Sequence, residues 1–129
     1  MEIDISQLTR IIYRKTNTTR QKEGIFMFHG KESRYSAERL QADEDGIIIG
    51  FGQSMTPILK SGQPVRVEPV TDETVIKKND IVFCKVNGHY YLHKVWAVKN
   101  NRYQIGNNHG HVNGWIGRKN LYGKVVEIL

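Results

Sequence analysis

Short apolar runs alternate with polar turn residues along the chain beyond residue 46. The runs are rich in Val, Ile and Tyr, which is typical of β-strands. Two of the runs are separated by Asn87-Gly88, and both residues tolerate the positive φ that a type I′ hairpin turn requires. The pattern predicts mostly antiparallel strands at residues 47–51, 64–69, 80–86, 90–99, 102–105 and 122–129.

The chain before residue 46 has a different pattern. Its first apolar residues recur at spacings of two, three and four, which favours a short amphipathic helix over residues 3–15. Residues 16–22 are polar and without periodicity, as in a loop or linker, and a brief helical turn fits residues 36–41. We therefore expect an N-terminal helix and linker arm at 1–45 and a mainly β domain at 46–129.

Composition places the chain among single-domain proteins. It has 129 residues, of which 39% are hydrophobic and 25% charged, and its mean hydropathy is −0.50. The longest apolar run, at residues 46–51, is far shorter than a membrane span, and the N-terminus lacks the features of a secretory signal. One cysteine is compatible with a reducing compartment. We expect a cytoplasmic protein with no membrane span.

Positive charge is concentrated in the C-terminal half of the chain. The formal net charge is +6, and Asp80 is the one acidic residue between positions 77 and 124. The same stretch carries nine basic residues, Lys77, Lys78, Lys85, Lys94, Lys99, Arg102, Arg118, Lys119 and Lys124. Such a surface can attract nucleic acid or an acidic partner. Basic residues scattered over strands and turns are more typical of a solvated surface, and both interpretations stay open.

Ser54 lies in a turn with glycines at positions 50 and 52, where the backbone can bend sharply and expose a hydroxyl group. A serine hydroxyl is a weak nucleophile near neutral pH and needs a base within hydrogen-bond reach. Serine and proline are also common in turns for conformational reasons alone. The motif by itself therefore permits either a nucleophile or a structural turn.

His93 is the candidate base, in the predicted strand that follows the Asn87-Gly88 hairpin. Alternation along a strand places His93 and Lys94 on opposite faces, so they cannot both point at Ser54. The unperturbed pKa of histidine lies near neutrality, whereas a lysine must be strongly desolvated to act as a base. A lone strand histidine is ordinarily structural, and only a nearby serine makes it a candidate.

A zinc site is the other chemistry that the histidines could support. On a strand, His89 and His93 would lie about 13 Å apart from the rise per residue, too far to share one ion. His109 and His111 sit in a Gly/Asn/His-rich loop at residues 105–116 but lack a convincing third ligand. We expect no metal site.

Taken in order, these segments resemble the LexA/signal-peptidase superfamily of serine peptidases over about residues 47–129. The motifs that carry the resemblance are G-x-S-M-x-P at 52–57, K-x-D-I-V at 78–82, a hydrophobic residue and H-K-V at 92–95, G-N-N at 106–108 and Y-G-K-V-V at 122–126. The resemblance implies curled antiparallel β-sheets of the LexA C-terminal-domain type. It also implies that Ser54 is the nucleophile and that His93 occupies the position of the general base, which is lysine in some branches and histidine in others.

Further roles follow from the same resemblance. Backbone amides near Ser54 and Met55, helped by Gln53, would hold the oxyanion, and Pro57 belongs to the same oxyanion and substrate-binding stretch. The side chain that orients His93 would be Asn107 or Asn108, ahead of Asn113. The resemblance implies no cofactor, and because domains of this family often pair, it makes a homodimer an expectation.

The chain departs from the family pattern in two ways. The histidine branch carries aspartates in and after a G-D-N segment, whereas residues 105–124 contain no acid. The chain also has no Ala-Gly or Cys-Gly bond, so self-cleavage of the LexA kind is not expected. One interpretation is hydrolysis of a peptide or protein substrate by Ser54 and His93. The other is a catalytically weak or inactive regulatory module that binds protein or nucleic acid. A small stand-alone member fits a phage or other mobile element.

Overall fold

The computed structural model describes residues 9–14, 24–28, 34, 37–38 and 45–129. Nearly all of these residues belong to strands or to the turns between them. The elements are β1 (Thr9–Arg14), β2 (Gly24–Phe28), β3 (Asp45–Ile49), β4 (Pro64–Pro69), β5 (Ile81–Val86), β6 (His89–Lys99), β7 (Arg102–Gly106), β8 (Val112–Gly117), a 3-10 turn η1 (Arg118–Asn120) and β9 (Leu121–Ile128).

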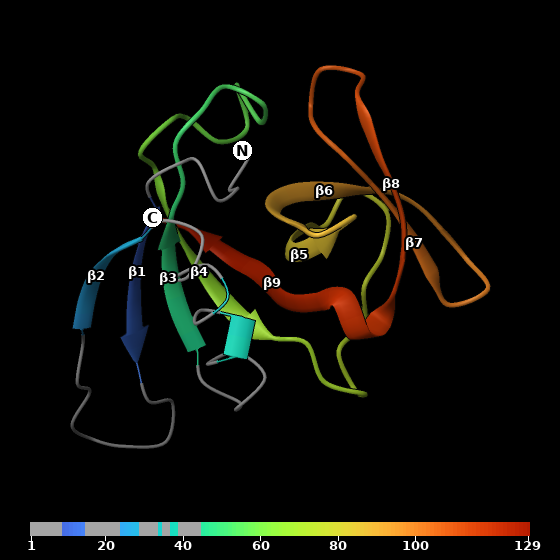
Figure 1. The fold of residues 1–129 in the computed structure, drawn as a ribbon, viewed down its shortest axis with the longest axis horizontal. Helices are drawn as coiled ribbons and strands as arrows, with labels where there is room; N and C mark the ends of the chain where they lie inside the picture. The colour runs from blue at the N-terminus through green and yellow to red at the C-terminus, as the bar shows by residue number, and fades with distance from the viewer. Residues whose placement is uncertain (1–8, 15–23, 29–33, 35–36, 39–44) are drawn as a thin grey trace.

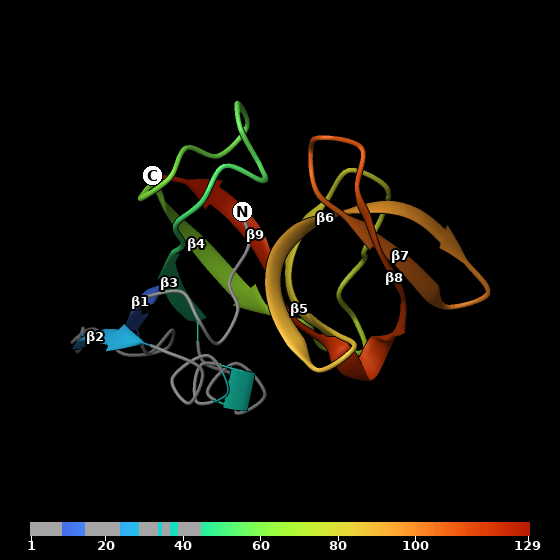
Figure 2. The same ribbon diagram turned by 45° about the horizontal axis from the view of Figure 1, so that its top comes forward.

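The strands form one nine-stranded sheet in the order β2-β1-β3-β4-β9-β5-β6-β7-β8, and each neighbouring pair is antiparallel. Strands β1 to β4 lie side by side in one half of the molecule, and β9 runs from them into the other half (Figure 1). There β5 and β6 curl strongly, as the second view shows (Figure 2). The prediction of a mainly β protein with curled antiparallel strands is confirmed.

Two tight hairpins shape the curled half. In the first, Asn87 and Gly88 have φ values of 49° and 83° and join β5 to β6. In the second, Asn100 and Asn101 have φ values of 51° and 59° and join β6 to β7. Positive φ at both central residues is the mark of a type I′ turn, whose twist matches that of the flanking strands. The hairpin predicted at Asn87-Gly88 is confirmed.

The prediction of a helix over residues 3–15 is wrong for the residues of β1, while residues 3–8 and 15 lie outside the described part. In β1, β-branched and aromatic residues predominate, and the strand pairs with both β2 and β3, for example through Ile12 and Ile47. The isoleucine-rich β3 offers β1 a partner for backbone pairing. This tertiary contact overrides the local preference for a helix. Strands from the predicted parts 1–45 and 46–129 thus share one sheet.

Of the helical turn predicted at 36–41, the described residues Ala37 and Glu38 are helical. Ala37 is buried and belongs to a core cluster that also contains the aromatic residues Phe83, Tyr90 and Tyr122. The rings of Phe83 and Tyr90 stack with their centroids 5.8 Å apart. The helical turn therefore packs on the aromatic part of the core.

The core consists of two clusters on the curved sheet. The first core cluster contains Ala37, the buried Met55 and Leu59 between β3 and β4, and side chains from β3, β4, β5, β6 and β9. The second contains side chains mainly from β5 and β7. The first comprises Ala37, Ile48, Met55, Leu59, Val65, Val67, Phe83, Tyr90, Leu92 and Tyr122. The second comprises Ile76, Val82, Cys84, Val86, Val95, Tyr103, Ile105, Ile116 and Leu121.

The strand β8 lies where the sequence predicts a Gly/Asn/His-rich loop at 105–116, and that prediction is wrong for residues 112–116. Its glycines, Gly114 and Gly117, give the segment little intrinsic β-propensity. Pairing with β7 overrides this, and the register shifts between Ile105 and Gly106. Because Gly106 pairs with Val112 and Ile105 with Gly114, the residue between them, Asn113, is left as a bulge.

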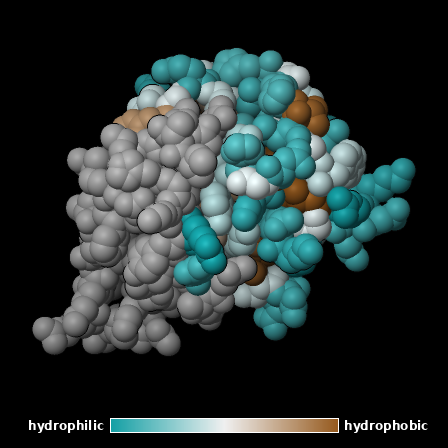
Figure 3. Space-filling model, in the orientation of Figure 1, coloured by the Kyte–Doolittle hydropathy of each residue, from teal (hydrophilic) through white to brown (hydrophobic). Residues whose placement is uncertain are grey.

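The face seen in Figure 3 is mostly hydrophilic over the described residues, with hydrophobic residues in small separate spots. Isolated apolar residues of this kind are normal on protein surfaces. Within the described ranges, no helix is long and apolar enough to cross a membrane.

Candidate active site

Ser54 lies in the connection between β3 and β4, at residues 50–63, which we call the Ser54 loop. Met55 and Leu59 from this loop are fully buried in the first core cluster and anchor it. The N–H of Gly62 donates to the carbonyl of Gly50 over 2.9 Å and closes the base of the loop. Gly52 has φ of 126°, a conformation that side-chain-bearing residues rarely adopt. The loop therefore has a fixed shape, and Ser54 at its tip stays partly exposed.

His93 lies in the middle of β6, opposite Val82 of β5. The residue is 1% exposed, and its ring stacks on that of Tyr91 with the centroids 4.8 Å apart. Strand pairing on both sides of β6 holds the backbone, and the stacked ring limits how the imidazole can rotate. The histidine is thus held in a dry and rigid setting.

The two side chains meet. Ser54 Oγ lies 3.1 Å from His93 Nε2, and His93 Nδ1 lies 2.6 Å from Asn113 Oδ1. A carbonyl oxygen can only accept, so Nδ1 carries the proton and Nε2 presents its lone pair to the serine hydroxyl. This tautomer, inferred from the hydrogen bonds, is the one that can take a proton from Ser54.

Asn113 is the residue that orients His93, and the prediction of Asn107 or Asn108 for this role is wrong. The bulge in β8 explains why Asn113 reaches the imidazole, because an extra residue re-aims a side chain that regular alternation would place elsewhere. Gly114, with φ of 148°, follows directly and allows the irregular backbone. The sequence signals an unusual segment through Asn-Gly but does not locate a bulge.

Burial dominates the electrostatics of His93. It lowers the pKa of the imidazole from 6.5 to about 3, and the hydrogen bond from Nδ1 to Asn113 offsets only part of this decrease. An amide carbonyl can accept a hydrogen bond but carries no net charge to stabilise imidazolium. His93 is therefore neutral at pH 7 and able to accept a proton, but it is a weak base.

Asn107 and Asn108 shape and dock the loop between β7 and β8. Asn107 Oδ1 accepts from the N–H of His109 over 2.8 Å and from that of His111 over 3.0 Å. Asn108 donates through its Nδ2 to the carbonyl of Thr56 over 3.0 Å. The preceding Gly106 must be glycine, since a Cβ there would lie 2.6 Å from the carbonyl oxygen of His111. The G-N-N segment thus builds the site without touching His93.

The other predicted residues of the Ser54 loop divide by exposure. Met55 has a fully buried side chain, so only its backbone can face a ligand, while Gln53 and Pro57 are exposed. The backbone N–H groups of Ser54 and Met55 have no hydrogen-bond acceptor among residues 9–14, 24–28, 34, 37–38 and 45–129. These are the two amides that the sequence proposes as oxyanion donors, and whether they act so stays a prediction.

His109 and Lys94 also contribute, and neither is predicted from the sequence to do so. His109 Nε2 lies 2.9 Å from the carbonyl of Gln53 and 3.0 Å from Thr56 Oγ1, and Lys94 Nζ donates to Asn108 Oδ1 over 3.0 Å. His109 is visible in the sequence only as a weak zinc ligand candidate. In the part of the chain that the structure describes, no group of three or more His, Cys, Asp or Glu side chains gathers as a metal ion would need.

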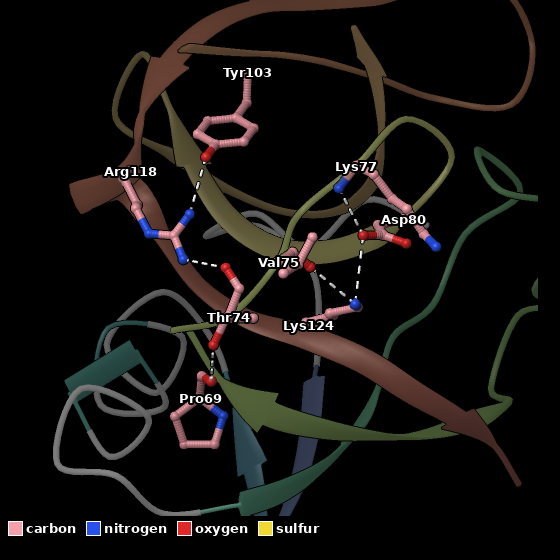
Figure 4. Close-up of polar contacts among 8 residues, drawn as sticks. All are labelled: Pro69, Thr74, Val75, Lys77, Asp80, Tyr103, Arg118 and Lys124. Carbon is pink, nitrogen blue, oxygen red and sulfur yellow. Dashed lines mark hydrogen bonds and ion pairs between the residues drawn. The ribbon is translucent and has the colours of Figure 1, made fainter. Parts of the chain in front are cut away.

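The basic residues of the C-terminal half are largely engaged within the protein. Arg118 donates to the Tyr103 hydroxyl over 3.0 Å and to the carbonyl of Thr74, and Lys124 donates to the carbonyl of Val75 over 3.0 Å (Figure 4). Arg118 also donates to the carbonyl of Thr71 over 2.6 Å. Contacts inside the protein are made by five of the nine, Lys85, Lys94, Arg102, Arg118 and Lys124. Much of this charge therefore holds the segment before β5 and neighbouring strands in place.

No protein-family model, curated protein or solved structure matches this chain.

Proposed function

We propose that this protein is a serine peptidase-like hydrolase, a small member of the LexA/signal-peptidase superfamily, in which Ser54 and His93 form the catalytic dyad. The observation that carries the proposal is the 3.1 Å approach of Ser54 Oγ to His93 Nε2, with Nδ1 held by Asn113. Three residues far apart in sequence meet in the order nucleophile, base and orienting group. This arrangement is the recurring signature of an activated serine nucleophile.

The proposed reaction is acyl transfer from a peptide or protein substrate. Ser54 Oγ attacks the carbonyl carbon, the carbonyl electron pair moves onto oxygen, and the serine proton passes to His93 Nε2. When the tetrahedral intermediate collapses, the C–N bond breaks and the leaving amine takes that proton. Water then attacks the acyl-enzyme with His93 again as base, which releases the acid and restores Ser54.

The N–H groups of Ser54 and Met55 are the proposed oxyanion donors. Both belong to the rigid tip of the Ser54 loop and lack another acceptor among the described residues. Donors fixed before the reaction stabilise the charge that develops on the carbonyl oxygen without further reorganisation. Gln53 and Pro57 flank these amides on the exposed side and are proposed to contact the substrate.

A catalytically weak member that binds a peptide or protein segment is the second candidate. The observation in its favour is the burial of His93, which lowers the pKa of the imidazole to about 3. With a neutral Asn113 behind it, the imidazolium formed during attack lacks a compensating charge. We therefore expect turnover to be slow even if the serine reacts.

Covalent labelling with an alkyl fluorophosphonate tests the proposal. In this reaction Ser54 Oγ bonds to phosphorus, fluoride leaves, and the serine proton passes through His93 to water. We expect wild type to gain the mass of one phosphonyl group at Ser54, and both Ser54→Ala and His93→Gln to gain none. Lys60→Ala, at an exposed position of the same loop where only backbone groups make hydrogen bonds within the described residues, is the matched control and should label like wild type. Equal labelling of wild type and Ser54→Ala contradicts the proposal.

A further inference from the structure

Three carbonyl groups of the Ser54 loop accept hydrogen bonds from one short segment, residues 107–109. The Asn108 N–H donates to the carbonyl of Ser54 over 2.8 Å. Asn108 Nδ2 donates to the carbonyl of Thr56 over 3.0 Å, and His109 Nε2 donates to that of Gln53 over 2.9 Å. The carbonyls of residues 53, 54 and 56 therefore all face the segment between β7 and β8.

The direction of these carbonyls fixes the direction of the oxyanion donors. The cis peptide bond of this loop is Thr56–Pro57, and the bonds 53–54 and 54–55 are trans. In a trans peptide unit the C=O and the following N–H point in opposite directions. Holding the Gln53 carbonyl thus aims the Ser54 N–H away from residues 107–109, and holding the Ser54 carbonyl does the same for the Met55 N–H.

The segment that holds the carbonyls is itself fixed from β6. Lys94 Nζ donates to Asn108 Oδ1 over 3.0 Å, which turns the amide so that Nδ2 faces Thr56. Trp96 Nε1 donates to the carbonyl of Asn107 over 3.0 Å. Lys94 and Trp96 lie on the same strand as His93, so β6 carries the base and also supports residues 107–109. We call the three hydrogen bonds from this segment to the carbonyls of the Ser54 loop the clamp.

We infer that Asn108 and His109, supported by Lys94, are positioning residues that preorganise the oxyanion hole of Ser54 and Met55. The inference rests on the proposed hydrolase function. Asn108 and His109 touch the outer side of the peptide units whose inner side would face the substrate oxygen. They act on the transition state through the backbone and contact neither substrate nor reacting atoms.

The first test compares fluorophosphonate labelling rates at pH 8 in Asn108→Ala, His109→Ala and His109→Gln. Losing a whole oxyanion donor slows a reaction by roughly 10²–10³-fold, so misaiming one should slow labelling by about tenfold. We expect that loss in His109→Ala, which frees the Gln53 carbonyl. Asn108→Ala should show a smaller loss, because it keeps the backbone N–H on the Ser54 carbonyl and removes only the side-chain contact to Thr56. His109→Gln keeps a side-chain N–H that can reach the Gln53 carbonyl and should recover most of the rate. Unchanged rates in both alanine variants overturn the inference.

His111→Ala is the matched control, because His111 is an exposed histidine of the same segment and bonds to Asn107 only through its backbone. It should label like wild type at pH 8. The NMR signal of the His93 Nδ1 proton should be unchanged in all variants, since the clamp does not touch the imidazole. Loss of that signal along with the rate shows general collapse of the site and contradicts a positioning role.

A second measurement separates this inference from the proposed function. Residual dipolar couplings report the direction of the Ser54 and Met55 N–H bonds whether or not the serine reacts. We expect the Ser54 coupling to change in His109→Ala, both couplings to change by a smaller amount in Asn108→Ala, and neither to change in His111→Ala. If wild type is not labelled but the couplings change, the clamp stands and the hydrolase proposal fails. Couplings that stay constant in the two alanine variants overturn the clamp.

Discussion

The nucleophile and the base of the candidate dyad are supported in different ways. Ser54 is partly exposed on a loop whose fixed shape depends on two buried anchors, Met55 and Leu59, in the first core cluster. His93 is buried within β6, where neighbouring strands pair on both sides and Tyr91 stacks on its ring. A few side chains therefore position the nucleophile, whereas the sheet itself positions the base.

The position of the nucleophile and the proton affinity of the base therefore depend on different parts of the molecule. Changes at the anchors of the Ser54 loop should move the nucleophile and leave the proton affinity of His93 unaltered. Changes in burial or charge around His93 should alter its proton affinity and leave the loop in place. The 3.1 Å contact between the two side chains is where these two supports meet.

The largest expected effect comes from replacing one large side chain by alanine in each core cluster in turn. Leu59→Ala removes a fully buried anchor of the Ser54 loop, and Ile116→Ala removes a buried residue of similar size from the second cluster. Each should lower the free energy of unfolding by about 2–5 kcal/mol, which chemical denaturation measures. Only Leu59→Ala should also slow fluorophosphonate labelling under conditions where both variants are folded. Equal slowing in both variants contradicts separate supports.

The sequence predicts the curled half of the fold because its signals there are local. Asn87-Gly88 favours a hairpin through its own conformational preference, and the β-rich runs on either side supply the two strands. The strand β1 could not be predicted in this way, since its apolar spacing fits a short helix as well as a strand. Its pairing with β3, which the local pattern does not contain, decides between them.

The candidate site shows the same division. Ser54 and His93 could be proposed because their motifs lie in short continuous stretches. Asn113 could not be ranked above Asn107 and Asn108, because its contact with His93 depends on a one-residue bulge between β7 and β8. A bulge is a property of two paired strands, so one strand's sequence does not specify it.

The pH dependence of stability tests the burial of the base. Folding lowers the pKa of His93 from 6.5 to about 3, so between these values the unfolded chain binds the proton more readily. The stability that the buried neutral imidazole contributes is fully present above pH 6.5. It is lost as the pH falls, by about 1.4 kcal/mol per pH unit. At pH 4 we expect a loss of about 3 kcal/mol in the free energy of unfolding relative to pH 7.

Denaturant titrations of wild type and His93→Gln over pH 3.5–7.5 measure this contribution by difference. Titrating groups that do not interact with His93 contribute equally to both proteins and cancel. The matched control is His89→Gln, because His89 is exposed at the start of the same strand. It should keep the full pH dependence of wild type. An identical pH dependence in wild type and His93→Gln contradicts a buried neutral imidazole.

The smallest expected effect, and the most direct probe of the base, is a change of charge behind it. Asn113→Asp places a carboxylate beside His93 Nδ1 in a partly exposed position, which should raise the pKa of the imidazole and stabilise imidazolium as it forms. We expect labelling of Ser54 at pH 7 to become about tenfold faster, and NMR titration of His93 to show the raised pKa. Asn113→Ala should slow labelling, since nothing then selects the Nδ1–H tautomer.

Asn100→Asp makes the same change of net charge in an exposed turn between β6 and β7 and should label like wild type. If Asn113→Asp is faster than Asn100→Asp, the missing charge behind the histidine limits the dyad, and the support of the nucleophile is already sufficient. Equal rates in the two variants contradict that limit. The positioning of Ser54 by its loop, and not the charge behind His93, would then limit the labelling rate.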